Sequence, residues 1–221
     1  MQLAPRAFFL LFVASSALRV SAQTADPYSL QASGLFTQLG GKAYEGLDPG
    51  GGVELQLRCR VGACGYLWGV LAPGKEIEGS AWSIGVGYQL TYHQLSKFQG
   101  NELLSGAFIE PRYAIDINSD NVFPYLSTRV TWLRQSLTSG TVSGSASGMT
   151  AGLGGGVLLK LSYNVLMDIG ATAGYTWFGD FGLLDSNTGV TRTGPAGAGY
   201  NIVARFGFAL GYRGARSSTK N

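Results

Sequence analysis

Apolar and polar residues alternate along most of this chain. In WSIGVGYQLTY, every second residue from Trp82 to Tyr92 is apolar, and the residues between them are Ser, Gly, Gln and Thr. A period of two residues is typical of a β-strand whose two faces differ. The same alternation predicts eight strands, at residues 28–38, 51–60, 82–92, 103–115, 123–134, 148–161, 165–178 and 200–212.

The lengths of these segments and of their connections indicate a membrane barrel. Each segment is near or above the roughly 9–11 residues that a tilted strand needs to cross a bilayer, and an even number of strands is typical of bacterial outer-membrane barrels. Long and short connections alternate, as they do in such barrels. The predicted long outer loops are 40–50, 93–102, 135–147 and 179–199, and the short inner turns are 116–122 and 162–164. Residues 61–79 break this rule, and we interpret them as a long periplasmic connection.

The charged residues indicate which face of the strands meets lipid. Nearly all charges inside the predicted strands share the polar face with Gly, Ser, Thr and Gln: Glu54, Arg58, Glu110, Arg112, Arg129, Lys160, Asp168 and Arg205. A water-soluble calyx would instead place apolar residues inside and charges outside. We therefore predict an eight-stranded antiparallel up-and-down transmembrane β-barrel of the all-β class, with its apolar face toward lipid.

The charges of the polar face then form a network inside the narrow lumen. Counting back from the turn at 116–122 places Glu110 and Arg129 opposite each other on adjacent strands. We predict this pair at the centre of a network whose other members are Glu54, Arg58, Arg112, Asp168 and Arg205. Two interpretations stay open, namely a structural plug that fixes strand register and a gated path for protons or ions.

Aromatic residues fall at both ends of the predicted strands. Tyr and Trp concentrate at the two interfaces of a membrane, where they form girdles around a barrel. The predicted girdle consists of Tyr28, Trp82, Tyr92, Tyr113, Trp132, Tyr175, Trp177 and Tyr212.

The N-terminal residues predict export. Arg6, the apolar run 7–18 and the small residues before a cut after Ala22 have the order of a cleaved signal peptide, residues 1–22. The barrel domain is then 23–213, followed by a polar tail at 214–221. Only Arg6 and Arg19 are removed with the signal from a chain whose net charge is +3, and no basic run remains. This excludes nucleic acid as an expected partner.

Two cysteines, Cys59 and Cys64, stand close together in RCRVGACG. Because an exported chain meets an oxidising compartment, we predict a local disulfide between them, with two free thiols as the alternative. A metal site is not expected because no histidine lies nearby.

The stretches FIEPRYAI, GLGGGVLL and FGFALGY resemble strands of the small eight-stranded outer-membrane barrels of Gram-negative bacteria, the OmpA/OmpX-like superfamily. The resemblance covers residues 28–212 and is one of pattern, without a catalytic motif. It implies location in the outer membrane, contact with its lipid and lipopolysaccharide, and insertion by the barrel-assembly machinery.

The sequence offers little support for catalysis. His93 is the only histidine. Some small barrels are lipid A-modifying enzymes with a rim histidine, a serine and an acid, but around His93 we find no oriented triad. GLGGG lacks the Lys-Ser/Thr ending of a phosphate-binding loop. We expect no enzyme activity, no cofactor and no metal.

The remaining prediction concerns function. Loop 179–199, with Asp180, Asp185, Asn187 and Arg192, is the best place for a surface contact. We predict a non-catalytic outer-membrane protein that supports membrane integrity or binds an extracellular ligand through its outer loops. The alternatives are a narrow channel or lateral conduit for small or hydrophobic solutes, and a lipid A-modifying enzyme.

Overall fold

The computed structural model describes residues 28–61, 81–96 and 100–212 of the 221-residue chain. β-strands dominate these residues, with one short 3₁₀ helix. The elements are β1 (Tyr28–Gly41), η2 (Lys42–Tyr44), β2 (Gly50–Arg60), β3 (Trp82–Gln94), β4 (Asn101–Ala114), β5 (Val122–Ser139), β6 (Val142–Lys160), β7 (Val165–Phe178), β8 (Asp180–Asp185), β9 (Thr191–Pro195) and β10 (Ala198–Tyr212).

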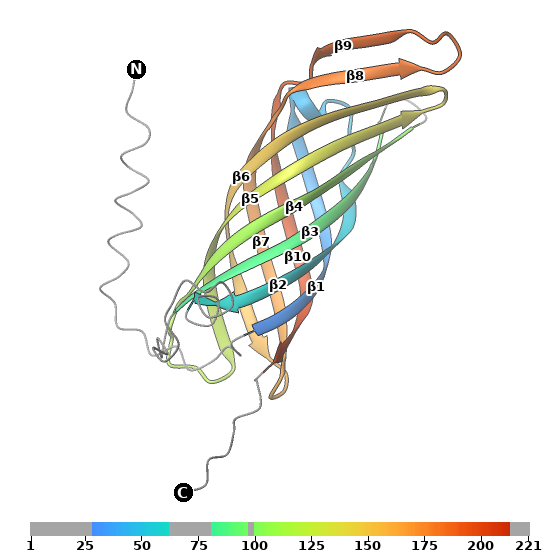
Figure 1. Ribbon diagram of the computed structural model, residues 1–221. Helices are drawn as coiled ribbons and strands as arrows, with labels where there is room; N and C mark the ends of the chain where they lie inside the picture. The colour runs from blue at the N-terminus through green and yellow to red at the C-terminus, as the bar shows by residue number, and fades with distance from the viewer. Residues whose placement is uncertain (1–27, 62–80, 97–99, 213–221) are drawn as a thin grey trace, which may run out of the picture.

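Eight of the strands close into a barrel (Figure 1). Each of β1 to β7 pairs antiparallel with its neighbour in sequence, and β10 pairs with both β7 and β1. The closing seam runs from Tyr28 opposite Tyr212 to Gly41 opposite Gly199. This confirms the predicted eight-stranded antiparallel barrel, whose wall has no unpaired strand edge.

The burial of side chains confirms the predicted faces. In β4 and β5 every second side chain is buried, and these side chains point into the lumen. Leu153 on the outside is 61% exposed, whereas Glu110 on the inside is 0% exposed. A soluble barrel shows the reverse pattern, so the wall is built to face lipid.

The predicted outer loop at 135–147 is wrong. β5 and β6 stay paired up to Ser139 opposite Val142, and only Gly140 and Thr141 form the turn. Gly140 has a φ of 57°, which suits the first central position of a tight hairpin turn. The prediction failed because this stretch is polar on one side and lacks the lipid-facing apolar residues by which the other strands were recognised.

The predicted loop at 179–199 connects β7 to β10, as expected, but it contains the hairpin β8–β9. β8 pairs with β6 at Val142–Ser145, beyond the point where β7 ends, and β9 pairs with β8. Figure 1 shows this hairpin beside the projecting ends of β5 and β6, on one end of the barrel. We call that end the outer end. The outer sheet is defined as residues 135–147 of β5 and β6 together with β8 and β9.

The remaining sequence predictions have mixed outcomes. The inner turns at 116–122 and 162–164 agree with the gaps between β4 and β5 and between β6 and β7. The signal peptide 1–22, the connection 61–79 apart from its first residue, and the tail 214–221 lie outside the described residues, so they stay predictions. Within the described ranges, no helix has the length and apolar character needed to span a membrane.

Candidate functional site

The polar faces of five strands bring seven charged side chains together inside the barrel. Each side chain follows the inward alternation of its own strand, and all seven are buried or nearly so. The seven charged residues are Glu54 and Arg58 from β2, Glu110 and Arg112 from β4, Arg129 from β5, Asp168 from β7 and Arg205 from β10. We call these seven residues, together with Tyr125 and Gln31, the lumen cluster. Lys160 shares the inward face but is exposed at the inner end of β6.

Glu110 is the centre of the lumen cluster. Its Oε1 accepts hydrogen bonds from Arg58 Nη2 at 2.8 Å and from Arg112 Nε at 2.5 Å. Its Oε2 accepts from Arg129 Nε at 2.6 Å and from Arg205 Nη1 at 3.0 Å. One carboxylate therefore binds four guanidinium groups that come from four different strands. The structure places Glu110 and Arg129 together across β4 and β5, where the sequence had put them.

Asp168 is a second centre, and two of its partners were missed by the sequence analysis. Tyr125 Oη donates to Asp168 Oδ1 at 2.7 Å, and Gln31 Nε2 donates to Oδ2 at 2.6 Å. Arg112 Nη2 lies 3.0 Å from Oδ2. Arg205 Nη2 donates to Tyr125 Oη at 2.9 Å, so the tyrosine links an arginine to the carboxylate.

Two glycines make room for the Tyr125 side chain. Tyr125 is opposite Gly156 in β6, and Gly156 is opposite Gly170 in β7. A Cβ at either glycine would lie within 2.5 Å of the Tyr125 hydroxyl. An inward tyrosine beside two facing glycines is a signal that the sequence contained. It also accounts for part of the GLGGG stretch without any phosphate chemistry.

Ion pairs and ring contacts complete the lumen cluster. Arg129 Nη1 binds Glu54 Oε2 at 2.6 Å, and Arg205 Nη1 lies 3.5 Å from Glu54 Oε1. The guanidinium of Arg129 lies 4.0 Å from the Phe108 ring centroid. Buried ion pairs tie neighbouring strands together, and removal of one partner leaves uncompensated charge, at a cost of about 3–5 kcal/mol. The cluster therefore fills the middle of the lumen with buried side chains.

A second closure lies at the outer mouth. The helix η2 brings Tyr44 into the barrel, where its hydroxyl donates to Thr176 Oγ1 at 2.9 Å and its ring packs edge-on against Phe178. Burial raises the pKa of Tyr44 to about 12, so its hydroxyl remains a neutral donor at physiological pH. Leu39 and Leu104 pack around Tyr44. The loop predicted at 40–50 is thus folded into the mouth.

The contacts of His93 indicate a structural role. It is fully buried, with Nδ1 3.0 Å from the backbone oxygen of Asp48 and Nε2 3.2 Å from Thr91 Oγ1. Glu102 is opposite His93 in register, yet no hydrogen bond joins these two side chains. Because both ring nitrogens are occupied by the loop and by the wall, His93 fixes the loop that carries Tyr44.

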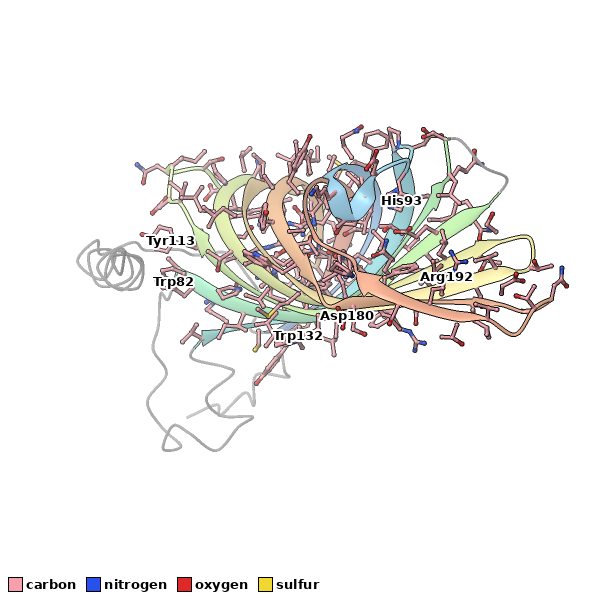
Figure 2. All side chains as sticks on the ribbon, turned by 90° about the horizontal axis from the view of Figure 1, so that it is seen from above. Trp82, His93, Tyr113, Trp132, Asp180 and Arg192 are labelled. Atoms are coloured by element: carbon pink, nitrogen blue, oxygen red, sulfur yellow. The ribbon has the colours of Figure 1, made fainter. Side chains whose placement is uncertain are left out.

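The predicted girdle residues lie at both ends of the wall. At the inner end the ring centroids of Trp82 and Tyr113 are 5.1 Å apart. Figure 2 shows both residues at one edge of the barrel. At the outer end Trp132, Met149 and Trp177 form one row across three strands. Of the other predicted girdle residues, Tyr92 and Tyr175 are exposed near the outer end and Tyr28 is half-buried at the inner end. The side chain of Tyr212 lies outside the described part of the chain.

The two remaining candidate sites are the cysteine pair and a metal site. Cys59 lies at the inner end of β2 and is disulfide-bonded. Its predicted partner Cys64 falls outside the described residues, so the pairing stays a prediction. Within the described ranges no group of three or more His, Cys, Asp and Glu side chains could hold a metal ion.

Comparisons with known proteins agree with the fold. No family model and no curated protein matches the sequence. Among solved structures, Neisserial surface protein A (NspA) matches with a TM-score of 0.58 and 17% identity, over 86% of this chain and all of that one. The outer membrane protein OprG from Pseudomonas aeruginosa matches with a TM-score of 0.52 and 9% identity, over 88% of this chain and all of that one.

A third match is the outer membrane protease OmpT from Escherichia coli, with a TM-score of 0.42 and 8% identity over 85% of this chain and 94% of that one. At these identities the likeness to NspA and OprG is one of fold alone. With a closed wall of eight antiparallel strands, an apolar exterior, two aromatic ends and a charged interior, the chain has the fold of the small eight-stranded outer-membrane β-barrels.

Proposed function

We propose that this barrel is a non-catalytic surface protein whose outer sheet binds an extended polypeptide segment outside the cell. The observation that carries the proposal is the open edge of β9. β9 pairs with β8 on one side, and within the described residues no strand pairs with its other side. An exposed strand edge presents unpaired N–H and C=O groups, which another extended chain can match by strand addition.

The outer sheet has the two faces that such a role requires. On the lumen side its apolar residues gather, and a Cβ at Gly144 would meet Phe181 at 2.5 Å and Leu183 at 2.8 Å. The opposite face continues the lipid-facing face of the wall. It carries mostly hydroxyl groups, from Ser136, Thr138, Ser143, Ser145, Ser147, Thr191 and Thr193. A sheet with one packed apolar side and one hydroxyl-rich side is suited to water, and its edge stays available for a partner.

Residues of the hairpin also limit uncontrolled pairing. Arg192 is exposed in β9, and Pro195 ends it, so a second chain finds only a short edge beside a positive charge. Short strands, charge and proline are the usual protection of sheet edges. Figure 2 shows Asp180 and Arg192 on the hairpin that projects beyond the wall. We therefore expect selectivity for particular segments, not general aggregation.

The alternative functions receive less support. A channel is disfavoured because the lumen cluster and Tyr44 close the lumen at two levels. A lipid A-modifying enzyme is disfavoured because His93 is buried and hydrogen-bonded to the loop that carries Tyr44. Replacement of His93 by Asn is expected to leave the lipid A profile of expressing cells unchanged, and an altered profile would restore the enzymatic alternative.

The test of strand addition uses the barrel in lipid nanodiscs and a displayed library of extended ten-residue peptides. Peptides selected on the intact protein should lose binding when 181–194 is replaced by a short Gly/Ser linker. They should also lose binding in Thr193→Pro, which alters the edge alone. The matched control is Thr193→Ala, which changes the same side chain but keeps the backbone N–H of the edge, and it should retain binding. Selected peptides that bind the linker variant as well as the intact protein would refute the proposal.

A further inference from the structure

A small cavity lies inside the lumen between the two closures. Its volume is about 20 Å³, and its polar lining consists of Gln89, Arg129, Thr131, Thr150, Thr172 and Asn201. Arg129 belongs to the lumen cluster, whereas Thr150 and Asn201 hydrogen-bond to Thr176 beneath Tyr44. A cavity of this size holds one water molecule or one ion of similar size.

The side chains around the cavity offer mainly donors. Arg129 donates hydrogen bonds from Nε and Nη1 to Glu110, Glu54 and Gln89. Its buried Nη2 is in ion-pair contact with Glu110 Oε2 but donates no hydrogen bond, so an N–H of Nη2 remains. Gln89 accepts from Arg129 through its carbonyl oxygen, so its amide nitrogen remains a donor. The methyl group of Thr131 lies against Gly106, which leaves the hydroxyl for the cavity. Within the described part of the chain, no carboxylate lines this space.

The charges next to the cavity do not balance. Four arginines and three carboxylates are in mutual contact, which leaves one surplus positive charge in a buried region. The other buried carboxylate, Glu102, lies at the outer end of β4 and forms no ion pair with these arginines. A buried unpaired charge is unfavourable, so a counter-charge within the lumen would stabilise the barrel.

We propose that this cavity binds one small monovalent anion, chloride under physiological conditions. The anion accepts hydrogen bonds from Thr131, from Gln89 and from the remaining N–H of Arg129, and it neutralises the surplus charge of the lumen cluster. Water would fill the same space without neutralising it. The site is independent of the outer sheet, so the inference holds whether or not the sheet binds a peptide.

Bromide replaces chloride in the first experiment because its anomalous scattering locates it. In crystals of the refolded barrel grown with bromide, we expect an anomalous peak inside the cavity, between Thr131 and Gln89. A peak absent from the cavity, with density there for a water molecule only, would overturn the proposal.

The second experiment measures the thermal unfolding midpoint in detergent, with chloride exchanged for gluconate at constant ionic strength. Gluconate is too large for the cavity, so the midpoint should fall in gluconate. Thr131→Val keeps the shape of the side chain but removes the hydroxyl, and most of this anion dependence should be lost. Thr37→Val removes a buried lumen hydroxyl away from the cavity and should retain it. An anion dependence that is equal in both variants would contradict the site.

Discussion

The barrel wall and the outer sheet share the strands β5 and β6. On each face of these strands, the side chains change between apolar and polar where the wall meets the outer sheet. Below the row of Trp132 and Met149, the lipid side is apolar and the lumen side is charged. Above that row, Arg134 and Ser147 begin a lipid side that is polar, while Leu137 joins a lumen side that is apolar. The strands continue with unchanged register, and only the solvent on each side differs.

Alternation fixes the two faces of a strand without fixing which solvent each face meets. In the wall, lipid surrounds the barrel and polar groups must pair inside. In the outer sheet water surrounds the strands, so apolar side chains pack on the protected side. The point of inversion in the sequence therefore marks the outer boundary of the membrane.

The largest expected effect is in the wall. Glu110→Gln removes the charge that four arginines share, so the free energy of unfolding should fall by about 3–5 kcal/mol. The midpoint of urea unfolding in detergent measures the loss. Asp180→Asn at the exposed start of the hairpin is the control and should change the free energy by less than about 0.5 kcal/mol. Equal effects of the two changes would break the contrast between wall and outer sheet.

A smaller loss is expected when the space beside Tyr125 is filled. In Gly156→Ala the new Cβ would meet the Tyr125 hydroxyl at 2.5 Å and displace it from Asp168. Overpacking of this kind costs about 1–3 kcal/mol. Gly34→Ala on the lipid face, where the nearest atom is 3.8 Å away, is the control. The same unfolding assay should show a loss for the first variant alone.

At the mouth, Tyr44→Phe removes the hydrogen bond to Thr176 and should cost about 0.5–1.5 kcal/mol. The variant also has a pH signature. Because burial raises the folded pKa of Tyr44 to about 12, above the usual value of 10.0, its contribution is complete below pH 10 and is lost as the pH rises toward 12. The stability difference between wild type and variant should shrink over that range. A difference that stays constant to pH 12 would contradict the buried position of Tyr44.

The smallest effect is expected in the outer sheet. Ser143→Ala changes one exposed hydroxyl on its polar side and should alter the free energy of unfolding by less than about 0.5 kcal/mol. A loss comparable to that of Gly156→Ala would show that the outer sheet and the wall unfold as one equally sensitive unit.

The sequence predicted the wall well because lipid imposes a strict rule on it. Every wall strand alternates over its full crossing, so the register of Glu110 and Arg129 follows from the turn between β4 and β5. The outer sheet was missed because a strand in water can be polar. Residues 142–147 have no regular series of apolar residues at every second position, so the two-residue period of a strand is not visible there. The role of Tyr125 was missed because it depends on Gly156 and Gly170 in other strands. The entry of Tyr44 into the mouth is likewise a tertiary contact.

The most direct test asks which end of the barrel lies at the cell surface. Thr193→Cys in β9 and Asn118→Cys in the turn between β4 and β5 are expressed separately in a Gram-negative host, and intact cells are treated with a membrane-impermeant maleimide. We expect labelling of Thr193→Cys in intact cells, and labelling of Asn118→Cys only after the envelope is broken. Labelling of Asn118→Cys in intact cells, with Thr193→Cys protected, would contradict the placement of the outer sheet at the cell surface.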